Sequence, residues 1–191
     1  MAVTSIMIVG VGGQGTLLAS KILGSVAVTQ GYDVKMSEVH GMAQRGGSVV
    51  TYVRYGDKVH SPIISPGEAD IVLAFEELEA MRWASFCKKG GTLIVNTQRI
   101  DPMPVVTGAK KYPSETVEQL SKSEDIRLIP VDALSLAKEA GTVKAVNVVL
   151  IGVLAKSSGI DKDVWIQAVK DNVPERFRDM NIKAFELGYN A

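Results

Sequence analysis

The chain opens with an apolar strand that breaks into glycines and then turns into a helix. Residues 5–15 read SIMIVGVGGQG, in which Gly10, Gly12 and Gly15 have the G-x-G-x-x-G spacing of phosphate-binding turns. In such a turn the first glycine permits the bend, the second admits a pyrophosphate, and the third lets helix and strand pack closely. A strand followed directly by a helix in this way predicts an α/β fold.

The rest of the chain repeats this alternation of short β-branched runs with longer helical patterns, which indicates a sheet with crossover helices. We expect strands at 3–9, 32–39, 48–55, 69–75, 92–95 and 126–131. We expect helices at 16–30, 76–88, 133–140, 145–158, 161–172 and 175–189. A length of 191 residues suits one domain. The predicted fold is therefore a single domain over residues 1–191, a three-layer α/β/α arrangement with a mostly parallel sheet and a helical C-terminal part.

Glycines and prolines mark the predicted turns. Gly56 and Asp57 predict a hairpin with a returning strand at 58–60, which would add antiparallel strands to the sheet. Gly90 and Gly91 are expected to cap the helix at 76–88. Prolines at 102, 104 and 113 indicate an excursion over the surface before the last strand.

The charge balance and the apolar runs exclude several classes of protein. Lysines and arginines number 21, aspartates and glutamates also 21, and the formal net charge is zero, which argues against a nucleic-acid binder. The N-terminus has no basic residue before Lys21, so it does not resemble a secretory signal, and we expect a cytoplasmic protein. The longest apolar run, 145–155, is interrupted by Asn147 and is shorter than the ~20 residues that span a bilayer, so we expect no membrane span.

Cysteine and histidine are too scarce for most redox or metal centres. Cys87 is the single cysteine, whereas an iron–sulphur cluster held by one chain needs about four thiolates. Cys87 lies in an apolar helical pattern, so we expect a packed thiol rather than a reactive one. His40 and His60 have no cysteine or carboxylate cluster at metal-ligand spacing nearby, so no metal site is predicted.

A second glycine-rich segment, SEVHGMAQRGGS at residues 37–48, follows the second predicted strand. Loops that leave the carboxyl ends of neighbouring parallel strands meet in one crevice, so we expect 10–15 and 38–47 to face each other. A helix N-terminus at this loop offers unpaired amides and partial positive charge to an anion. The predicted anion-facing, substrate-facing or coenzyme A-facing site consists of Gly10, Gly12, Gly13, Gln14, Gly15, His40, Gln44, Arg45, Gly46 and Gly47.

Each member of this site has a plainer interpretation. Gln14 and Gln44 would supply amide contacts and Arg45 would pair with a phosphate or carboxylate, but Gln44 and Arg45 would equally serve to pin one loop to the other or to a partner subunit. The glycines would also suit simple packing of strand against helix. His40 is a titratable group without an orienting neighbour identifiable from sequence. No catalytic residue is therefore predicted in this chain.

A nicotinamide- or flavin-binding protein of the Rossmann type is the alternative interpretation of the first loop. That fold needs an acidic residue near the end of its second strand to hold the ribose hydroxyls, and Glu38 is in roughly that place. The polar, glycine-rich segment after Glu38 does not fit, because such a domain normally runs straight into its second helix there. A purely structural interaction module is a third interpretation.

The two glycine loops together resemble the gamma-type domain of 2-oxoacid:ferredoxin oxidoreductases, and within them most closely the small (beta) subunits of indolepyruvate ferredoxin oxidoreductases. The resemblance rests on GVGGQGT at 10–16 and SEVHGMAQRGG at 37–47. It continues in order through SPII at 61–64, ADIVLAFE at 69–76, GGTLIVN at 90–96 and the helix around Asn147. It therefore covers nearly the whole chain.

This resemblance implies a subunit that works within a larger enzyme. The alpha subunit would hold thiamine diphosphate, magnesium and the iron–sulphur clusters, and this chain alone would bind no cofactor. The family reaction oxidatively decarboxylates an arylpyruvate, with coenzyme A as the acyl acceptor and ferredoxin as the electron acceptor. The chain has no Gly-Asp-Gly followed by an asparagine about thirty residues later, the usual metal–diphosphate motif of thiamine enzymes. We expect the isolated chain to be inactive.

Overall fold

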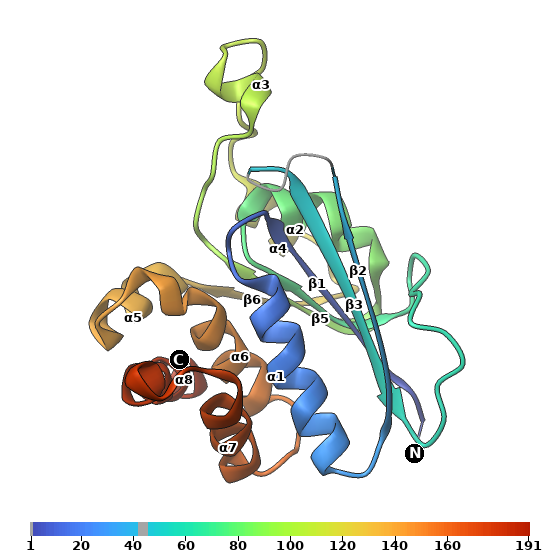
Figure 1. Cartoon of the computed structure of the whole chain (residues 1–191). Helices are drawn as coiled ribbons and strands as arrows, with labels where there is room; N and C mark the ends of the chain where they lie inside the picture. Colours follow the sequence, from blue (N-terminus) through green and yellow to red (C-terminus); the bar gives the residue numbers. More distant parts are fainter. Residues whose placement is uncertain (1, 42–45) are drawn as a thin grey trace.

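The computed structural model describes residues 2–41 and 46–191, and these form a mixed sheet of six strands in the order β2-β3-β1-β4-β5-β6 (Figure 1). The strands are β1 Thr4–Val11, β2 Asp33–His40, β3 Ser48–Gly56, β4 Ala69–Ala74, β5 Cys87–Asn96 and β6 Arg127–Val131. β1, β4, β5 and β6 are parallel, whereas β3 runs antiparallel to both β1 and β2. The predicted α/β class, with a mostly parallel sheet and an antiparallel addition, is confirmed.

Helices cover both faces of the sheet (Figure 1). The helices are α1 Thr16–Thr29, α2 Glu77–Trp83, α3 Met103–Val106, α4 Thr116–Ser121, α5 Ala133–Ala140, α6 Val146–Lys156, α7 Lys162–Asn172 and α8 Arg178–Asn190. Three short 3-10 helices are η1 Ala84–Phe86, η2 Val143–Ala145 and η3 Glu175–Phe177. Among the described residues, no helix combines the length and the apolar character that crossing a bilayer requires.

Alternating side chains of the strands divide the interior into two cores. On β1, Ile6 and Ile8 face the larger core under α1 and the C-terminal helices, while Met7 and Val9 face the core under α2 and α4. All four side chains are fully buried. Because successive residues of a strand point to opposite faces, a strand covered on both sides reads as the continuous apolar run seen at 6–9.

The antiparallel hairpin is present, but its place differs from the prediction. It consists of β2 and β3, which pair from Asp33↔Gly56 to His40↔Val49 and are joined through residues 41–47. The predicted return strand at 58–60 does not form, because both edges of β3 are already occupied by β1 and β2. Instead the Val59 backbone N–H donates to Asp33 Oδ2 at 2.8 Å, which holds this segment against the first residue of β2.

The predicted helix at 76–88 is too long. α2 ends at Trp83, η1 follows, and β5 begins at Cys87, so Cys87 lies on a strand and not on a helix. Gly90 and Gly91 do not cap a helix but lie inside β5, where the β4–β5 register shifts between Ala69 and Ile71. Gly90 takes φ +76° there, a conformation suited to a bulge.

The proline-marked segment between β5 and β6 leaves the body of the protein. α3 stands on a stalk of two extended segments without regular secondary structure, which projects beyond the sheet, and α4 then packs beside α2 (Figure 1). The predicted surface excursion is confirmed, with short helices that the sequence pattern did not indicate.

Candidate functional site

The first glycine loop lies at the carboxyl end of β1, between Val11 and the first turn of α1. Gly13 takes φ +102° and Gly15 takes φ +82°, so both occupy the left-handed region that favours glycine. Gly15 is the N-cap of α1 and supplies no side-chain hydrogen bond to the helix. The first amides of α1 therefore have no side-chain cap, which leaves them available to an anion.

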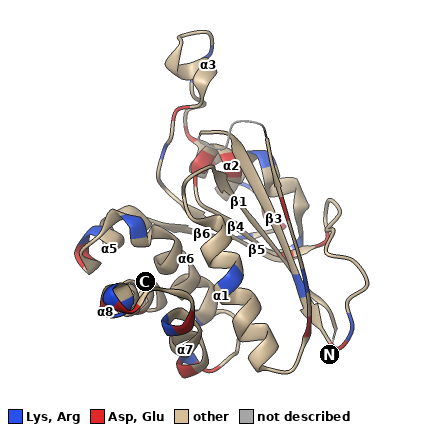
Figure 2. Ribbon diagram, viewed as in Figure 1, with Lys and Arg blue, Asp and Glu red and all other residues tan. Residues whose placement is uncertain are grey.

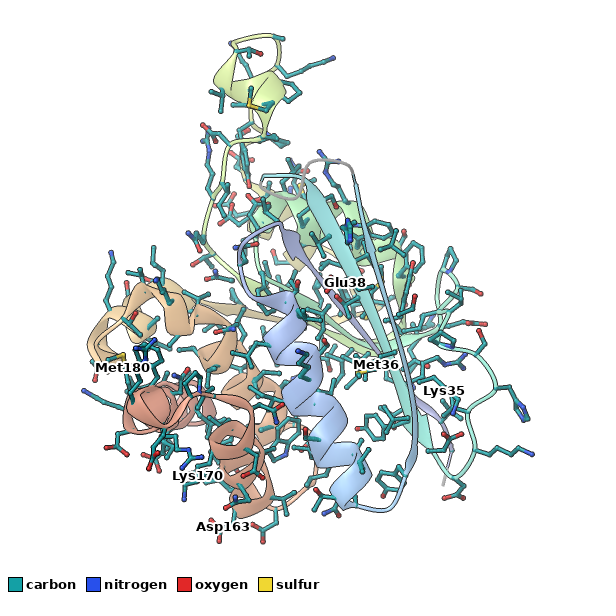
Figure 3. All side chains as sticks on the ribbon, in the orientation of Figure 1. Lys35, Met36, Glu38, Asp163, Lys170 and Met180 are labelled. Carbon is teal, nitrogen blue, oxygen red and sulfur yellow. The ribbon has the colours of Figure 1, made fainter. Side chains whose placement is uncertain are left out.

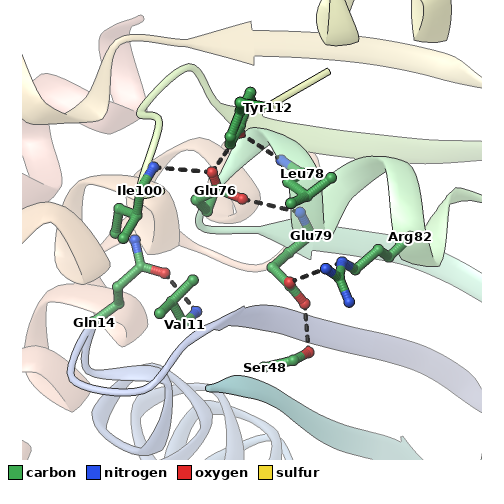
Figure 4. Close-up of polar contacts among 9 residues, drawn as sticks. All are labelled: Val11, Gln14, Ser48, Glu76, Leu78, Glu79, Arg82, Ile100 and Tyr112. Atoms are coloured by element: carbon green, nitrogen blue, oxygen red, sulfur yellow. Dashed lines mark hydrogen bonds and ion pairs between the residues drawn. The ribbon is translucent and has the colours of Figure 1, made fainter. Parts of the chain in front are cut away.

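The Gln14 side chain faces inward and holds this loop on the sheet. Its Oε1 accepts from the Val11 N–H at 2.7 Å, and its Nε2 donates to the Phe75 carbonyl at 2.9 Å (Figure 4 draws the Val11 contact). A Cβ on Gly10 would lie 2.9 Å from Gln14 Oε1 and 3.0 Å from Phe75 Cβ, so Gly10 makes room for this arrangement. The predicted anion contact of Gln14 would have to use its second amide hydrogen, because both ends of the side chain already have partners.

Asn147, at the start of α6, anchors the loop from the other side. Its Nδ2 donates to the Gly15 carbonyl at 3.2 Å, and its side chain is buried. A Cβ on Gly15 would lie 2.5 Å from Asn147 Nδ2. The third glycine of the motif therefore serves close packing, as predicted, although its neighbour comes from α6.

The second glycine segment meets the first, as expected from the sequence. The Gly12 N–H donates to the Gly47 carbonyl at 2.8 Å, and the Gly46 N–H donates to the Gly12 carbonyl at 3.3 Å. The reason differs from the prediction, which assumed that β1 and β2 are neighbours. β3 lies between them, and its first residues pair with the end of β1. Gln44 and Arg45 lie outside the described residues.

A cleft of about 620 Å³ opens on one side of the first loop. Its lining consists of Gly13, Gln14, Gly15, Gln98, Leu134, Lys138, Val143, Lys144 and Val146. Lys138 lies in the last turn of α5 and Lys144 in η2, and both are exposed. Among the described residues of this lining the only charged side chains are these two lysines, which together with the open amides of α1 make the cleft suited to an anion. We call it the lysine cleft.

A second cleft, of about 410 Å³, lies on the other side of the loop. Gly12, Gly13, Gly15 and Thr16 form one wall, and Glu38 and His40 of β2 contribute to the other. Figure 3 labels Glu38 on β2, and its Oε2 accepts from Thr51 Oγ1 at 3.1 Å. His40 is exposed, and its Nδ1 lies 3.3 Å from the Gly41 carbonyl oxygen. The structure thus brings His40 to the glycine loop without giving it a catalytic partner among the described residues.

Sequence reasoning missed the polar groups that fix the carboxyl edge of the sheet. Asn96 is fully buried, donates from Nδ2 to the Phe75 carbonyl at 3.0 Å, and accepts at Oδ1 from the Ala133 N–H at 3.2 Å. Phe75 therefore accepts hydrogen bonds from both Gln14 and Asn96. This arrangement ties the glycine loop to the ends of β4 and β5 and to the start of α5.

Glu76 is a second polar group that the sequence did not single out. Its side chain is 1% exposed, and its carboxylate accepts from the Glu79 N–H at 3.0 Å, the Ile100 N–H at 3.0 Å and the Tyr112 hydroxyl at 2.5 Å (Figure 4). Burial and this hydrogen bond raise the pKa of Tyr112. Three donors satisfy a carboxylate that would otherwise be costly to bury. The signal that would have identified Glu76 is its place directly after β4, where the carboxyl edge begins.

Cys87 is a packed thiol, as predicted. Its side chain is buried, and burial, with a smaller effect of Asp70, raises the pKa of the thiol to about 11. A thiol with this pKa is protonated at neutral pH and is a poor nucleophile. Within the described residues, no three His, Cys, Asp or Glu side chains come together in a way that could hold a metal ion.

Comparison with known proteins relates the chain to one family. Residues 5–191 match the family model described as pyruvate ferredoxin/flavodoxin oxidoreductase. The chain is 42% identical over 191 residues to the indolepyruvate oxidoreductase subunit IorB of Pyrococcus horikoshii, a match that covers 98% of this chain and 95% of the relative. It is 29% identical to the ketoisovalerate oxidoreductase subunit VorA of Methanothermobacter marburgensis, of which it covers 35%.

Solved structures give the same picture of the fold. The gamma subunit of the keto/oxoacid ferredoxin oxidoreductase from Geobacter sulfurreducens superposes with a TM-score of 0.73 at 25% sequence identity. That match covers 98% of this chain and 96% of the neighbour. The arrangement of sheet and helices is therefore the one found in that gamma subunit.

Proposed function

Because the chain belongs to the pyruvate ferredoxin/flavodoxin oxidoreductase family, we propose that it is the beta-type subunit of an indolepyruvate (arylpyruvate):ferredoxin oxidoreductase. The observation that carries this proposal is the 42% identity to the IorB subunit over nearly the full length of both chains. In this proposal an alpha subunit holds the thiamine diphosphate, magnesium and iron–sulphur clusters. Coenzyme A receives the acyl group, and ferredoxin receives the electrons.

The composition of this chain supports placing the redox cofactors on the partner. A cluster of four thiolates cannot be built from one cysteine, and Cys87 is in addition buried and protonated. The residues present thus do not fit an iron–sulphur centre. Thiamine diphosphate, when bound to the partner, supplies the carbanion chemistry of the decarboxylation, and this chain contributes only walls and anion contacts.

We call the carboxyl edge of the sheet that carries the two glycine segments, residues 10–16 and 46–47, the glycine edge. In the proposed complex the glycine edge faces the active-site region of the alpha subunit. The lysine cleft combines the open amides at the start of α1 with Lys138 and Lys144, a donor set that fits the phosphates of coenzyme A or a carboxylate. Arg45 would add a further cation to the same edge, as the sequence predicts.

Reconstitution tests this proposal. The isolated chain should show no turnover, whereas mixing it with the alpha subunit of the same organism should give reduction of an electron acceptor that depends on arylpyruvate and on coenzyme A. A panel of 2-oxoacids then ranks indolepyruvate against phenylpyruvate and aliphatic substrates. Turnover by the isolated chain, or a mixture that prefers pyruvate, would refute the proposal.

The alternative, a free-standing nicotinamide- or flavin-binding protein, has one observation in its favour. Glu38 shares the second cleft with the glycine loop, as a ribose-binding carboxylate would. The sheet order argues against it, because β3 separates β2 from β1, whereas a dinucleotide-binding domain has the two strands adjacent. A thermal-shift assay with NAD, NADP, FMN and FAD discriminates, since a ligand at 100 times its dissociation constant stabilises by about 2.7 kcal/mol.

A further inference from the structure

Residues 99–111 form an arm that projects from the same edge of the sheet as the glycine loop. The arm follows β5, whose carboxyl end lies beside the carboxyl ends of β4 and β1 in the parallel part of the sheet. Figure 1 shows α3 standing clear of the body at the tip of this arm. Apart from three half-buried positions, every residue of the arm is exposed, so the arm contributes little to the core.

The base of the arm is clamped to the body through one buried carboxylate. Glu76 Oε1 accepts from the Ile100 N–H on the segment that leaves the body and from the Tyr112 hydroxyl on the segment that returns to it. The Arg99 guanidinium lies 4.2 Å from the centre of the Tyr112 ring and pairs with Asp101 at 2.6 Å. These contacts fix where the stalk leaves the body and in which direction it points.

The tip of the arm is ordered by its own backbone. The N–H groups of Val105 and Val106 donate to the Pro102 carbonyl at 2.8 and 3.0 Å, and the Lys110 N–H donates to the Pro104 carbonyl at 2.8 Å. These hydrogen bonds hold the turn at the tip from within the arm. An element that is ordered before binding loses little conformational entropy when it docks.

The tip combines exposed apolar side chains with positive charge. Met103 and Val106 are 67% and 65% exposed, the two highest exposed fractions among the large apolar side chains of the described residues, and they lie three residues apart on the same short helix. Lys110 and Lys111 follow on the returning side of the arm, where the Lys110 N–H contacts the Pro104 carbonyl, and Asp101 is the only acidic residue in the sequence between 99 and 112. Figure 2 shows basic colouring at the tip of the arm. An apolar centre beside basic residues fits a partner surface with an apolar pocket and an acidic rim.

We propose that this arm is the docking element for the alpha subunit, which receives Met103 and Val106 in an apolar pocket with acidic residues at its rim. The inference rests on the proposed function, which supplies the subunit that faces the glycine edge. Arm and glycine loop leave the same edge, so one partner reaches both. A stable interface takes roughly 20–30 residues from each side, which is more than the arm contains, so a partner that receives the arm has to contact further parts of the same edge.

The test measures binding of the purified chain to the purified alpha subunit by biolayer interferometry. Val106→Asp places a charge at the proposed contact and should raise the dissociation constant about tenfold or more. Val28→Asp is the matched control, because Val28 is 62% exposed on α1 but lies roughly 18 Å along the helix axis from the glycine edge. A double variant, Lys110→Glu with Lys111→Glu, should slow association and reverse its dependence on salt. Unchanged melting temperatures show that the variants are folded.

The outcomes separate the two proposals. Weakening by Val106→Asp and not by Val28→Asp supports the docking role. If the wild-type chain binds the alpha subunit and Val106→Asp binds equally well, the arm is not the docking element and the proposed function stands. If Val106→Asp instead dissociates a homo-oligomer and leaves alpha-subunit binding intact, the arm docks on a second copy of this chain and the proposal is wrong. A wild-type chain that does not bind the alpha subunit refutes the proposed function, and the docking role with it.

Discussion

Replacing Gly15 by alanine should destabilise the chain more than the same change at Gly13, two residues away in the same loop. Both glycines take positive φ, so alanine at either position is forced into the left-handed region at a cost of about 1–2 kcal/mol. Gly13 has open space around its Cβ position, with no heavy atom within 4 Å. The expected loss of unfolding free energy for Gly13→Ala is therefore about 1–2 kcal/mol.

At Gly15 a steric contribution adds to the backbone cost. The new Cβ would lie 2.5 Å from Asn147 Nδ2, closer than Cβ atoms approach other heavy atoms, and 3.2 Å from its Cγ, which is a tight contact. Moving the buried Asn147 side chain strains its hydrogen bonds to the Gly15 carbonyl and from the Val148 N–H. Overpacking of this kind costs about 1–3 kcal/mol, so Gly15→Ala should lose about 2–5 kcal/mol in total.

Urea unfolding of the purified chain measures the difference. Each variant should lower the midpoint at an unchanged slope, and the shift at Gly15→Ala should exceed the shift at Gly13→Ala. The variant Asn147→Ala removes the side chain that the new Cβ meets. The destabilisations caused by Gly15→Ala and Asn147→Ala should therefore be non-additive, and the double variant should be about 1–3 kcal/mol more stable than their sum predicts. Equal losses at the two glycines, or additive losses in the double variant, would refute the proposed contact between the loop and α6.

Three further predictions concern the lysine cleft, the stalk and the buried thiol. In the reconstituted enzyme, Lys138→Ala and Lys144→Ala should each raise the KM for coenzyme A about tenfold and leave assembly unchanged, as steady-state kinetics and gel filtration would show. Tyr112→Phe leaves the Leu78 N–H without its acceptor and should lower stability by about 1–3 kcal/mol in thermal unfolding. The pKa of Cys87 is raised from 9.0 to about 11, so the unfolded chain releases this proton first as the pH rises. Stability is therefore unaffected below pH 9, and between pH 9 and 11 the wild type should lose up to roughly 2–3 kcal/mol relative to Cys87→Ala in urea titrations.

The sequence predicted the fold where local patterns and tertiary structure agree. The continuous apolar run at 6–9, the glycine turn and the amphipathic face of α1 specify a buried strand and its helix, and each of these was placed within about two residues. The helical C-terminal part was predicted equally well, because its caps at Asp132 and Asp161 are local signals. Local chemistry sufficed for these elements.

The prediction was wrong where the outcome depends on which strands are neighbours. The hairpin at 56–60 has a plausible local turn, but β3 has no free edge once β1 and β2 have paired with it. The predicted helix at 76–88 continues an apolar pattern that is equally consistent with η1 and the start of β5. Local sequence does not carry this information, since pairing is decided by distant strands.

The candidate site shows the same limit. The glycines of both loops were found from their spacing, and the contact between Gly12 and Gly47 confirms that the loops meet. Lys138, Lys144 and Asn147 lie more than a hundred residues away in the sequence, and only the fold brings them to the loop. The sequence associated the helix around Asn147 with the family but did not indicate its contact with Gly15. Gln14 was predicted as an anion contact from its place in the motif, whereas in the structure its side chain holds the loop on the sheet through Val11 and Phe75.

Amide hydrogen exchange on residues 12–18 tests most directly whether the glycine edge faces the partner. In the isolated chain the first amides of α1 lack a side-chain cap and should exchange rapidly. On assembly with the alpha subunit these amides should exchange at least about tenfold more slowly. The amides of α7, which contacts the C-terminal half of α1 through Asn172 and Ser25, should not change. An active complex in which residues 12–18 exchange as fast as in the isolated chain would contradict the account.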